Sequence, residues 1–287
     1  MSAPVTIIIC ADDFGLSTGV NTGIMELVQL GRLSAVSCMP GLPAFSKDGP
    51  SLKTLRQKID IGVHLTLSDQ EPVGEMPLFA PDGKFQPFGT VLMRAILGRL
   101  PIHEIATEIK RQIDAFIDVF GEPPDFLDGH HHVHQLPGIR AIILAAAVEY
   151  GLNKRIYVRA CDDRVNIVIK RWVGLGTALS IGVFGGSLRR DARKLGILTN
   201  TGFAGAYRYG KGVAYGDVFP RMLHALEPGS IVFCHPGVPD QELHQRDSFV
   251  DGRLDELNYL KSDACAKHLE ERMISIGRFA TAAANAF

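Results

Sequence analysis

The sequence has no excess of charge of either sign, and this absence narrows the kinds of partner that the protein can have. Thirty Lys and Arg residues stand against 31 Asp and Glu residues in a chain of 287. Without a basic excess or a basic block, composition argues neither for nucleic acid nor for an anionic membrane surface as a partner. A neutral small molecule is compatible with this balance, as are many other ligands.

Long hydrophobic runs and paired cysteines are absent as well. The longest uncharged stretch, 172–188, contains five glycines and is shorter than the roughly 20 apolar residues of a membrane helix. We interpret it as a buried or lid segment. The N-terminus lacks the pattern of a signal peptide. Cys10, Cys38 and Cys234 lie within apolar runs and no CxxC pair occurs, which predicts buried thiols, no disulfide framework and a cytoplasmic protein.

Short apolar runs alternate with helical patterns along the whole chain. No internal repeat and no linker divides it, so we expect one domain over residues 1–287 with a parallel sheet, closed as a barrel or left open. A proline-rich loop over 68–89 is expected at the substrate rim. The expected strands are 5–10, 34–39, 59–67, 126–134, 155–160, 230–234 and 274–279, and the expected helices are 20–30, 102–120, 138–150 and 254–273.

Polar residues that can bind a metal fall at the ends of four of these strands. Asp12 and Asp13 end the first strand, His64 lies late in the third, a histidine run at 130–134 ends the fourth, and His235 ends a late strand. Because the carboxyl ends of parallel strands meet on one face of a sheet or barrel, these side chains are expected to converge. Carboxylate with imidazole is a ligand set that suits Zn, and also Fe, Co, Ni or Mn.

Each of these motifs also has an explanation without function. The two aspartates can form a polar turn, His64 can be a core histidine with satisfied hydrogen bonds, and His235 can belong to a simple turn. Four histidines in the five positions 130–134 are harder to explain without a ligand, which favours binding. If that segment is extended, His130, His132 and His134 share one face, where one would ligate and the others would orient it or line a groove.

The motifs together resemble one family. The blocks ADDFGLS at 11–17, GVHLTL at 62–67, DGHHHVH at 128–134 and HPG at 235–237 resemble the YdjC-like carbohydrate deacetylases, also called the ChbG/HpnK family. The resemblance implies a distorted, TIM-like (β/α) barrel and a single YdjC-like deacetylase domain. Residues 162–193 match nothing in this pattern.

The resemblance also implies roles for individual residues. Asp12 corresponds to the general base, and Asp13, His64 and His130 to the ligands of one divalent ion, with Zn or Mg expected first and Mn or Co left open. His235 is the candidate general acid. No residues for any other cofactor are identified. The implied reaction removes the N-acetyl group from an acetylated amino sugar, of the chitooligosaccharide or glycolipid type.

Two alternatives stay open at this point. One is a metal-dependent hydrolase of another amide or ester on the same scaffold, and the other is a non-catalytic protein that binds a metal or a sugar. The sequence also leaves open the acetylated substrate, the roles of His131, His132 and His134, and the role of 162–193. It leaves the oligomeric state open too, although the relatives suggest a homodimer.

Overall fold

The computed structural model describes residues 4–152, 155–209 and 212–284. Its centre is a nine-stranded sheet in which every pairing is parallel, in the order β6-β5-β4-β3-β2-β1-β8-β7, with β9 paired to β1. The strands are β1 (Val5–Phe14), β2 (Ala35–Cys38), β3 (Asp60–Leu65), β4 (Phe126–Gly129), β5 (Tyr157–Val158), β6 (Leu198–Thr199), β7 (Phe203–Ala204), β8 (Ile231–Cys234) and β9 (Ile274–Ile276).

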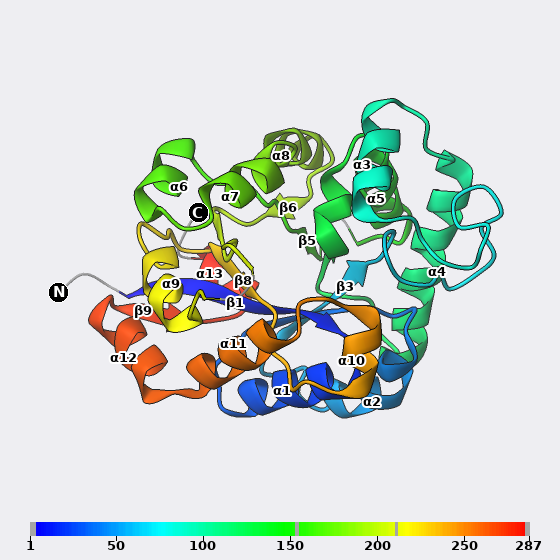
Figure 1. Ribbon diagram of the computed structural model, residues 1–287. Helices are drawn as coiled ribbons and strands as arrows, with labels where there is room; N and C mark the ends of the chain where they lie inside the picture. The colour runs from blue at the N-terminus through cyan, green and yellow to red at the C-terminus, as the bar shows by residue number, and fades with distance from the viewer. Residues whose placement is uncertain (1–3, 153–154, 210–211, 285–287) are drawn as a thin grey trace.

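Helices follow most of the strands and cover the outside of the sheet. In Figure 1, α1, α2 and α10 to α12 lie below the strands and α3 and α5 to α8 lie above them. The helices are α1 (Thr18–Gln29), α2 (Pro43–Lys53), α3 (Phe88–Ile96), α4 (Ile102–Phe120), α5 (Ile139–Glu149), α6 (Val165–Arg171), α7 (Leu175–Gly182), α8 (Gly185–Lys194), α9 (Tyr215–Met222), α10 (Gln241–Arg246), α11 (Asp251–Lys261), α12 (Asp263–Glu271) and α13 (Phe279–Ala284), with the 3-10 helix η1 (His130–Gln135).

The central strand β1 shows how the chain separates two hydrophobic layers. Ile7 and Ile9 belong to the large core between sheet and helices, whereas Ile8 and Cys10 belong to a smaller cluster with residues of β4, β5, β7 and β8. Side chains alternate between the faces of a strand, so Asp12 continues the row of Ile8 and Cys10. The strand therefore carries this carboxylate toward the inside of the sheet, at its carboxyl end.

The expected fold class is confirmed, because parallel strands with covering helices form a distorted β/α barrel. Strands β6 and β7 stand at the two ends of the strand order, and no pairing joins them within the described part of the chain. The curled sheet is thus an incomplete barrel, open between β6 and β7. No described helix is long and apolar enough to cross a membrane.

Two expectations about elements were wrong. The strand at 126–134 ends at Gly129, and the histidine run continues as η1. The helix at 254–273 is two helices, α11 and α12, because Ser262 is extended and caps α12 through the backbone nitrogen of Cys265. The segment 172–188 was expected to be buried or to form a lid. Part of it is α7, which has no buried residue, so the buried interpretation fails there and the lid interpretation stays a prediction. The helix at 102–120 begins and ends as predicted.

Candidate active site

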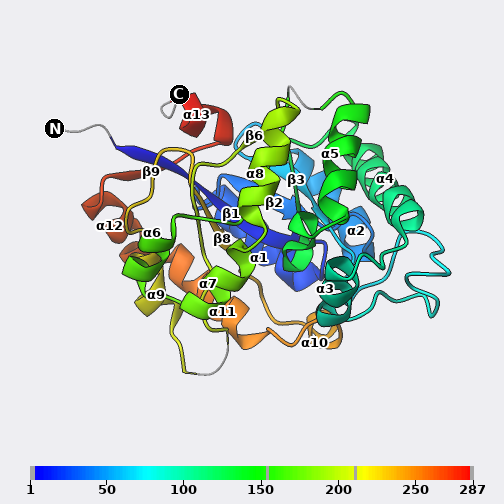
Figure 2. The same cartoon turned by 90° about the horizontal axis from the view of Figure 1, so that it is seen from above.

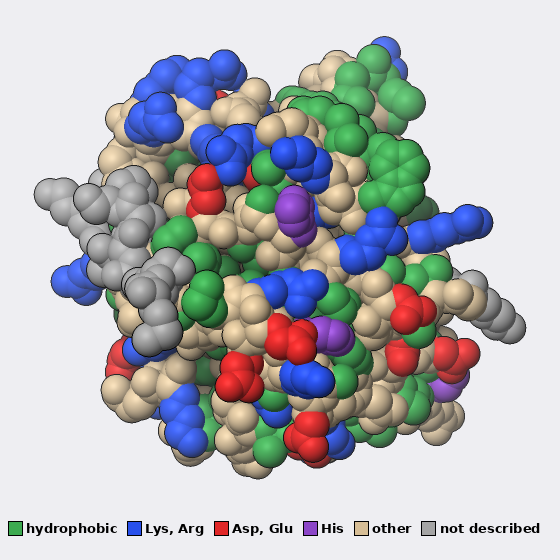
Figure 3. Space-filling model, turned by 90° about the vertical axis from the view of Figure 1, so that its left-hand side faces the viewer, with side chains coloured by type: hydrophobic (Ala, Val, Ile, Leu, Met, Phe, Trp, Pro, Cys, Tyr) green, Lys and Arg blue, Asp and Glu red, His purple; other side chains and the backbone are tan. Residues whose placement is uncertain are grey.

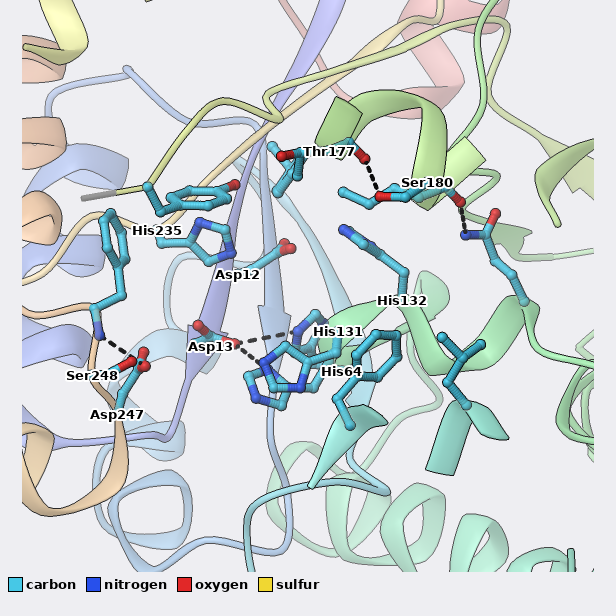
Figure 4. Close-up of a pocket in the computed structure, with 18 of the residues that line it drawn as sticks. Asp12, Asp13, His64, His131, His132, Thr177, Ser180, His235, Asp247 and Ser248 are labelled. Carbon is cyan, nitrogen blue, oxygen red and sulfur yellow. Dashed lines mark hydrogen bonds and ion pairs between the residues drawn. The ribbon is translucent and has the colours of Figure 1, made fainter. Parts of the chain in front are cut away.

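A cavity of about 420 Å³ opens at the carboxyl ends of the strands. Its lining includes all five residues that the sequence singles out as base, acid or metal ligands: Asp12, Asp13, His64, His130 and His235. They come from β1, β3, η1 and the segment after β8. Figure 4 shows Asp12 beside His235, Asp13 and His64 below them, and Thr177 and Ser180 of α7 above.

The two adjacent aspartates both reach this cavity because β1 is irregular at its end. The pairing of β1 with β2 shifts register between Ala11 and Phe14, and Asp13 has a φ of 68°. In a regular strand, neighbouring side chains point to opposite faces, but a bulge and a left-handed residue redirect the second one. Asp tolerates this conformation better than most residues do. The local backbone therefore places both carboxylates at one cavity.

The histidine run does not share one face, contrary to the expectation for an extended segment. His131 and His132 have φ values of 50° and 57°, so the backbone turns sharply there and successive imidazole rings point in different directions. Nδ1 of His131 lies 2.9 Å from Oγ of Ser68, which ties the proline-rich loop to the rim of the cavity. Nε2 of His134 donates to the carbonyl of Arg159 at 2.8 Å. Only His130 faces Asp13.

Asp13, His64 and His130 form a compact cluster of metal-ligand type. The Oδ1 atom of Asp13 lies 3.3 Å from Nε2 of His64 and 3.1 Å from Nδ1 of His130. Their ligand atoms all lie within 4.8 Å of one another. Burial lowers the pKa of His130, so its ring is neutral and keeps a lone pair, as a metal ligand requires.

The other side of His64 is held by a buried carboxylate. Nδ1 of His64 lies 2.7 Å from Oδ1 of Asp128, and Ser37 donates to the same oxygen at 2.5 Å. A carboxylate behind a histidine fixes which ring nitrogen faces the site, as is usual for metal-binding histidines. Burial by itself would lower the pKa of His64, but Asp128 and Asp12 outweigh it and raise this pKa to about 10. The surroundings of His64 therefore favour positive charge.

Two buried arginines pair with the carboxylates of the site. Arg159 donates to both oxygens of Asp12, at 2.7 and 2.6 Å, and lies 2.6 Å from Asp128. Arg253 donates to Oδ2 of Asp13 at 2.6 Å and to Asp247 at 2.5 Å. Burial opposes ionisation of Asp13, yet Arg253 and His130 hold its pKa well below the usual range. The aspartate is therefore anionic, with one oxygen on Arg253 and the other on the histidines.

The charge balance of this cluster fits a cation. Three carboxylates with almost no exposure (Asp12, Asp13 and Asp128) face only two guanidinium groups. An unpaired buried charge is costly, so the cluster favours one further positive charge beside Asp13. A proton on His64 supplies it, and a divalent cation on the oxygen and nitrogen donors of Asp13, His64 and His130 would supply it as well. The donor set and the charge balance thus fit a metal centre.

His235 lies apart from this cluster and is neutral. Burial lowers the pKa of His235 to about 4. Its backbone nitrogen donates to Glu256 at 2.6 Å, and the ring packs edge-on against Tyr209 and Phe249. Its Nδ1 atom has no hydrogen-bond partner among the residues that the structure describes. A buried imidazole with a free nitrogen at a cavity is available for proton transfer.

The sequence pattern did not point to Arg159, Arg253 or Glu256. Arg159 follows β5 directly, so the rule that polar residues at strand ends meet at one site would have found it. Arg253 and Glu256 lie in α11. Arg253 is far along the chain from Asp13, and the strand-end rule does not apply to residues within a helix. Cys234, the only cysteine next to a site residue in sequence, is buried, which raises its thiol pKa well above the usual value and makes it a poor nucleophile.

The protein is an incomplete parallel β/α barrel, and carboxylates and imidazoles converge at the ends of its strands. Its class is therefore that of barrel proteins with a candidate metal centre at the usual place for an active site. Comparison of the sequence with protein families specifies it further. The family described as YdjC-like protein matches residues 6–271, and the chain belongs to this family. The resemblance read from the motifs is confirmed.

Individual relatives agree with this assignment. A chitooligosaccharide deacetylase of Klebsiella pneumoniae (strain 342) is 30% identical over 277 residues, which is 95% of this chain and 97% of that protein. A solved structure from Enterococcus faecalis V583, described provisionally as a cellobiose-phosphate cleavage protein, has a TM-score of 0.74 at 22% identity and covers 98% and 99% of the two chains. A peptidoglycan N-acetylglucosamine deacetylase has a TM-score of 0.50 at 10% identity, over 97% of this chain and 87% of that one. Both of these solved structures share the fold of this chain.

Proposed function

We propose that the protein is a cation-dependent hydrolase that removes the N-acetyl group from an amino sugar. The observation that carries this proposal is the buried cluster of Asp13, His64 and His130, whose donors and charge balance fit a divalent cation, with Asp12 and His235 on the same cavity. Family membership and the names of the relatives support the substrate class, a chitooligosaccharide or the amino sugar of a glycolipid.

In this proposal Asp13, His64 and His130 hold the cation. A divalent cation in such a site lowers the pKa of water and polarises the carbonyl group of an amide. Asp128 keeps Nε2 of His64 turned toward Asp13, and Arg253 keeps the Asp13 carboxylate oriented. All of these groups come from one copy of the chain.

Asp12 is the proposed general base. Its two oxygens accept hydrogen bonds from Arg159, but a carboxylate has about four lone-pair directions, so it can still accept a proton from the attacking water. Arg159 also lies against Asp128 and is fully buried, so it fixes the direction of the Asp12 carboxylate. A base held in one orientation contributes to rate by position as well as by proton affinity.

His235 is the proposed general acid, and its low pKa sets a condition on that role. At neutral pH the ring begins without the proton that it must donate. When water attacks the amide, negative charge develops in the cavity and favours protonation of the ring beside it. His235 then passes this proton to the departing nitrogen. His235 takes the proton that it donates from solvent, and Asp12 releases to solvent the proton that it accepted from the attacking water. One water is therefore consumed, and the products are acetate and an amine.

The types of donor atom at the site indicate which metal ion it would hold. Mixed oxygen and nitrogen donors suit Zn, and Mg is the alternative if water completes most of the coordination. The five cysteines are free and buried, which supports the cytoplasm as the place of action because thiols stay reduced there.

Acetate release from N,N'-diacetylchitobiose tests the proposed function. We expect release that stops on treatment with a chelator and returns when Zn or Mg is added. Release of acetate from an aryl acetate but not from the sugar would favour the alternative of a different amide or ester. Binding of metal and sugar with no release from either substrate would favour the non-catalytic alternative.

A further inference from the structure

Helix α6 and the residues after it carry an exposed hydrophobic stripe. Val165, Ile169 and Trp172 are separated by four and three residues, so they share one side of the helix. Their exposed fractions are 58%, 46% and 67%. Leu179 of α7 and Val183, four residues later, are exposed in the same way. Large apolar side chains gathered on one surface usually mark a place of interaction.

Helix α7 is unusual because it is apolar in sequence but has no buried residue. One side of it lines the cavity through Thr177, Ser180 and Ile181, while Leu179 on another side faces solvent. Helix α3 resembles it, since Phe88 and Leu92 line the same cavity. Residues of α3 and of the turn after it are exposed and apolar: Met93, Ile96 and Leu97. The wall of the cavity thus has an apolar outer surface.

Exposed positive charge lies on the same helices as this apolar surface. Residues 164–194 contain seven Lys and Arg residues and one acidic residue, Asp191. Four of the seven form ion pairs with Asp162, Asp163, Asp191 or Glu227, so the local excess comes from the other three. Lys170, Arg190 and Arg193 are exposed. Figures 1 and 2 place α6, α7 and α8 together at the top of the molecule. Figure 3 shows Lys and Arg together with hydrophobic side chains over the upper part of the face that it views.

We propose that this face, formed by α6, α7, α8 and α3, docks on an anionic lipid bilayer. Apolar side chains would enter the boundary between headgroups and acyl chains, and the exposed Lys and Arg would contact lipid phosphates, as in helices that lie in a membrane interface. Trp172 is the residue type that favours this boundary. The composition of the whole chain did not indicate such a partner, because the charges elsewhere cancel the local excess.

The charge of this face favours lipid over a second copy of the chain. A symmetric dimer through the same face would bring Lys170 and Arg193 of each copy close to the like charges of the other copy. An anionic bilayer instead neutralises them. Because α7 and α3 also line the cavity, docking would hold the cavity wall against the lipid surface. The proposal does not depend on deacetylase activity, and its test requires no turnover.

The single tryptophan of the chain, Trp172, allows a direct test with the full-length protein. We expect its fluorescence to shift to shorter wavelength when vesicles of phosphatidylcholine with phosphatidylglycerol are added, and the protein to sediment with them. Vesicles of phosphatidylcholine alone should bind much less, and binding to the anionic vesicles should weaken as salt is raised. Absence of both signals at low salt, or equal binding to both kinds of vesicle, would overturn the proposal.

Two double variants that retain Trp172 separate the contributions. Ile169→Ser with Val183→Ser should reduce partitioning into anionic vesicles at least about tenfold. The matched control, Leu30→Ser with Met273→Ser, replaces apolar residues of similar exposure elsewhere and should bind as the parent does. Lys170→Glu with Arg193→Glu should weaken binding at least about tenfold. Its control, Lys47→Glu with Lys58→Glu, changes exposed lysines near α2.

A dimer through this face would give a different pattern. In that case the Trp172 emission would depend on protein concentration without vesicles, and Ile169→Ser with Val183→Ser would convert dimers to monomers in light scattering. That result would overturn lipid docking in favour of self-association. Equal loss of vesicle binding in the two apolar variants would also overturn it, because the effect would then not belong to this face.

Discussion

Asp12 and Asp13 are neighbours in the chain but have different partners in the fold. Arg159 occupies both oxygens of Asp12, whereas Asp13 divides its oxygens between Arg253 and two histidines. A simple polar turn would give the two residues equivalent surroundings. Their environments therefore distinguish a group that is held in orientation from a group that can share a cation.

Conservative replacement of each aspartate should separate the two roles. Asp13→Asn removes an anionic ligand, so bound metal and activity should fall together, by more than the roughly 10- to 100-fold typical of losing an outer partner of a metal site. Asp12→Asn should retain its metal but turn over very slowly. Metal analysis after dialysis measures the difference, with thermal melting as a check on folding. Loss of metal in Asp12→Asn with retention in Asp13→Asn would exchange the two roles.

The histidine run offers a matched pair of ligand variants. His130 faces Asp13, whereas Nδ1 of His132 lies 3.4 Å from the sulfur of Cys161. We expect His130→Ala to lose most of its bound metal and His132→Ala to keep it, as metal analysis would show. Full retention in His130→Ala with loss in His132→Ala would assign the third ligand to His132.

The neutral ring of His235 leads to a prediction about leaving groups. His235→Ala should keep its metal but deacetylate about 10²- to 10⁴-fold more slowly, because the amine leaves poorly without a proton. An acetate ester, whose alkoxide leaves more readily, should show a smaller loss. Turnover of matched amide and ester substrates measures this ratio. The same loss for both substrates would contradict the role of proton donor.

At the scale of elements, α1 and the segment after β8 approach each other too closely for side chains. The backbone nitrogen of Gly19 donates to Asp240 at 2.5 Å, and its carbonyl accepts from Val238 at 3.1 Å. A Cβ atom on Gly19 would overlap the carbonyl oxygen of Val238. This contact holds the segment that carries His235.

We therefore expect Gly19→Ala to reduce the free energy of unfolding by about 1–3 kcal/mol, as overpacking does, and to lower turnover by displacing the segment of His235. Gly89→Ala is the matched control, since no atom lies within 4 Å of a Cβ built there, and it should change stability by less than about 0.5 kcal/mol. Urea unfolding of the two variants measures both effects. Equal stability of the two variants would show that the contact is not tight.

At the scale of the whole molecule, buried histidines couple stability to pH in both directions. Burial lowers the pKa of His134 and of His235 from 6.5 to about 4, so the folded protein resists protons that the unfolded chain accepts. Their contribution to stability is complete above pH 6.5 and is lost as the pH falls toward 4. The raised pKa of His64 acts oppositely: its contribution is complete below pH 6.5 and is lost as the pH rises toward about 10.

The metal-free protein should therefore be most stable near pH 6.5, with a loss on each side. Each buried neutral histidine can account for up to about 3 kcal/mol of the free energy of unfolding that is lost at acid pH. Urea unfolding between pH 4 and 10 measures the profile. His134→Gln keeps a donor toward the Arg159 carbonyl but does not titrate, so its acid loss should be smaller. A profile that rises steadily from pH 6.5 to 4 would contradict this account.

The sequence by itself determined the class of fold, most of the element positions and the residues that meet at the cavity. Strands such as β1 and helices such as α4 depend on local periodicity, and the convergence of polar strand ends follows from parallel topology. The residues predicted as metal ligands, Asp13, His64 and His130, do lie together, and their role as ligands stays a prediction.

Only the tertiary structure decided the orientation of the histidine run, the partners of each aspartate and the exposure of 165–183. The turn at His131 and His132 depends on left-handed backbone conformations that no local pattern announced. Arg253 reaches Asp13 across 240 positions of the chain, and such a contact has no signal in the residues beside it. The sequence did not predict the exposed apolar surface of α6 and α7 for a similar reason. A hydrophobic stripe looks the same in sequence whether the fold covers it or leaves it exposed.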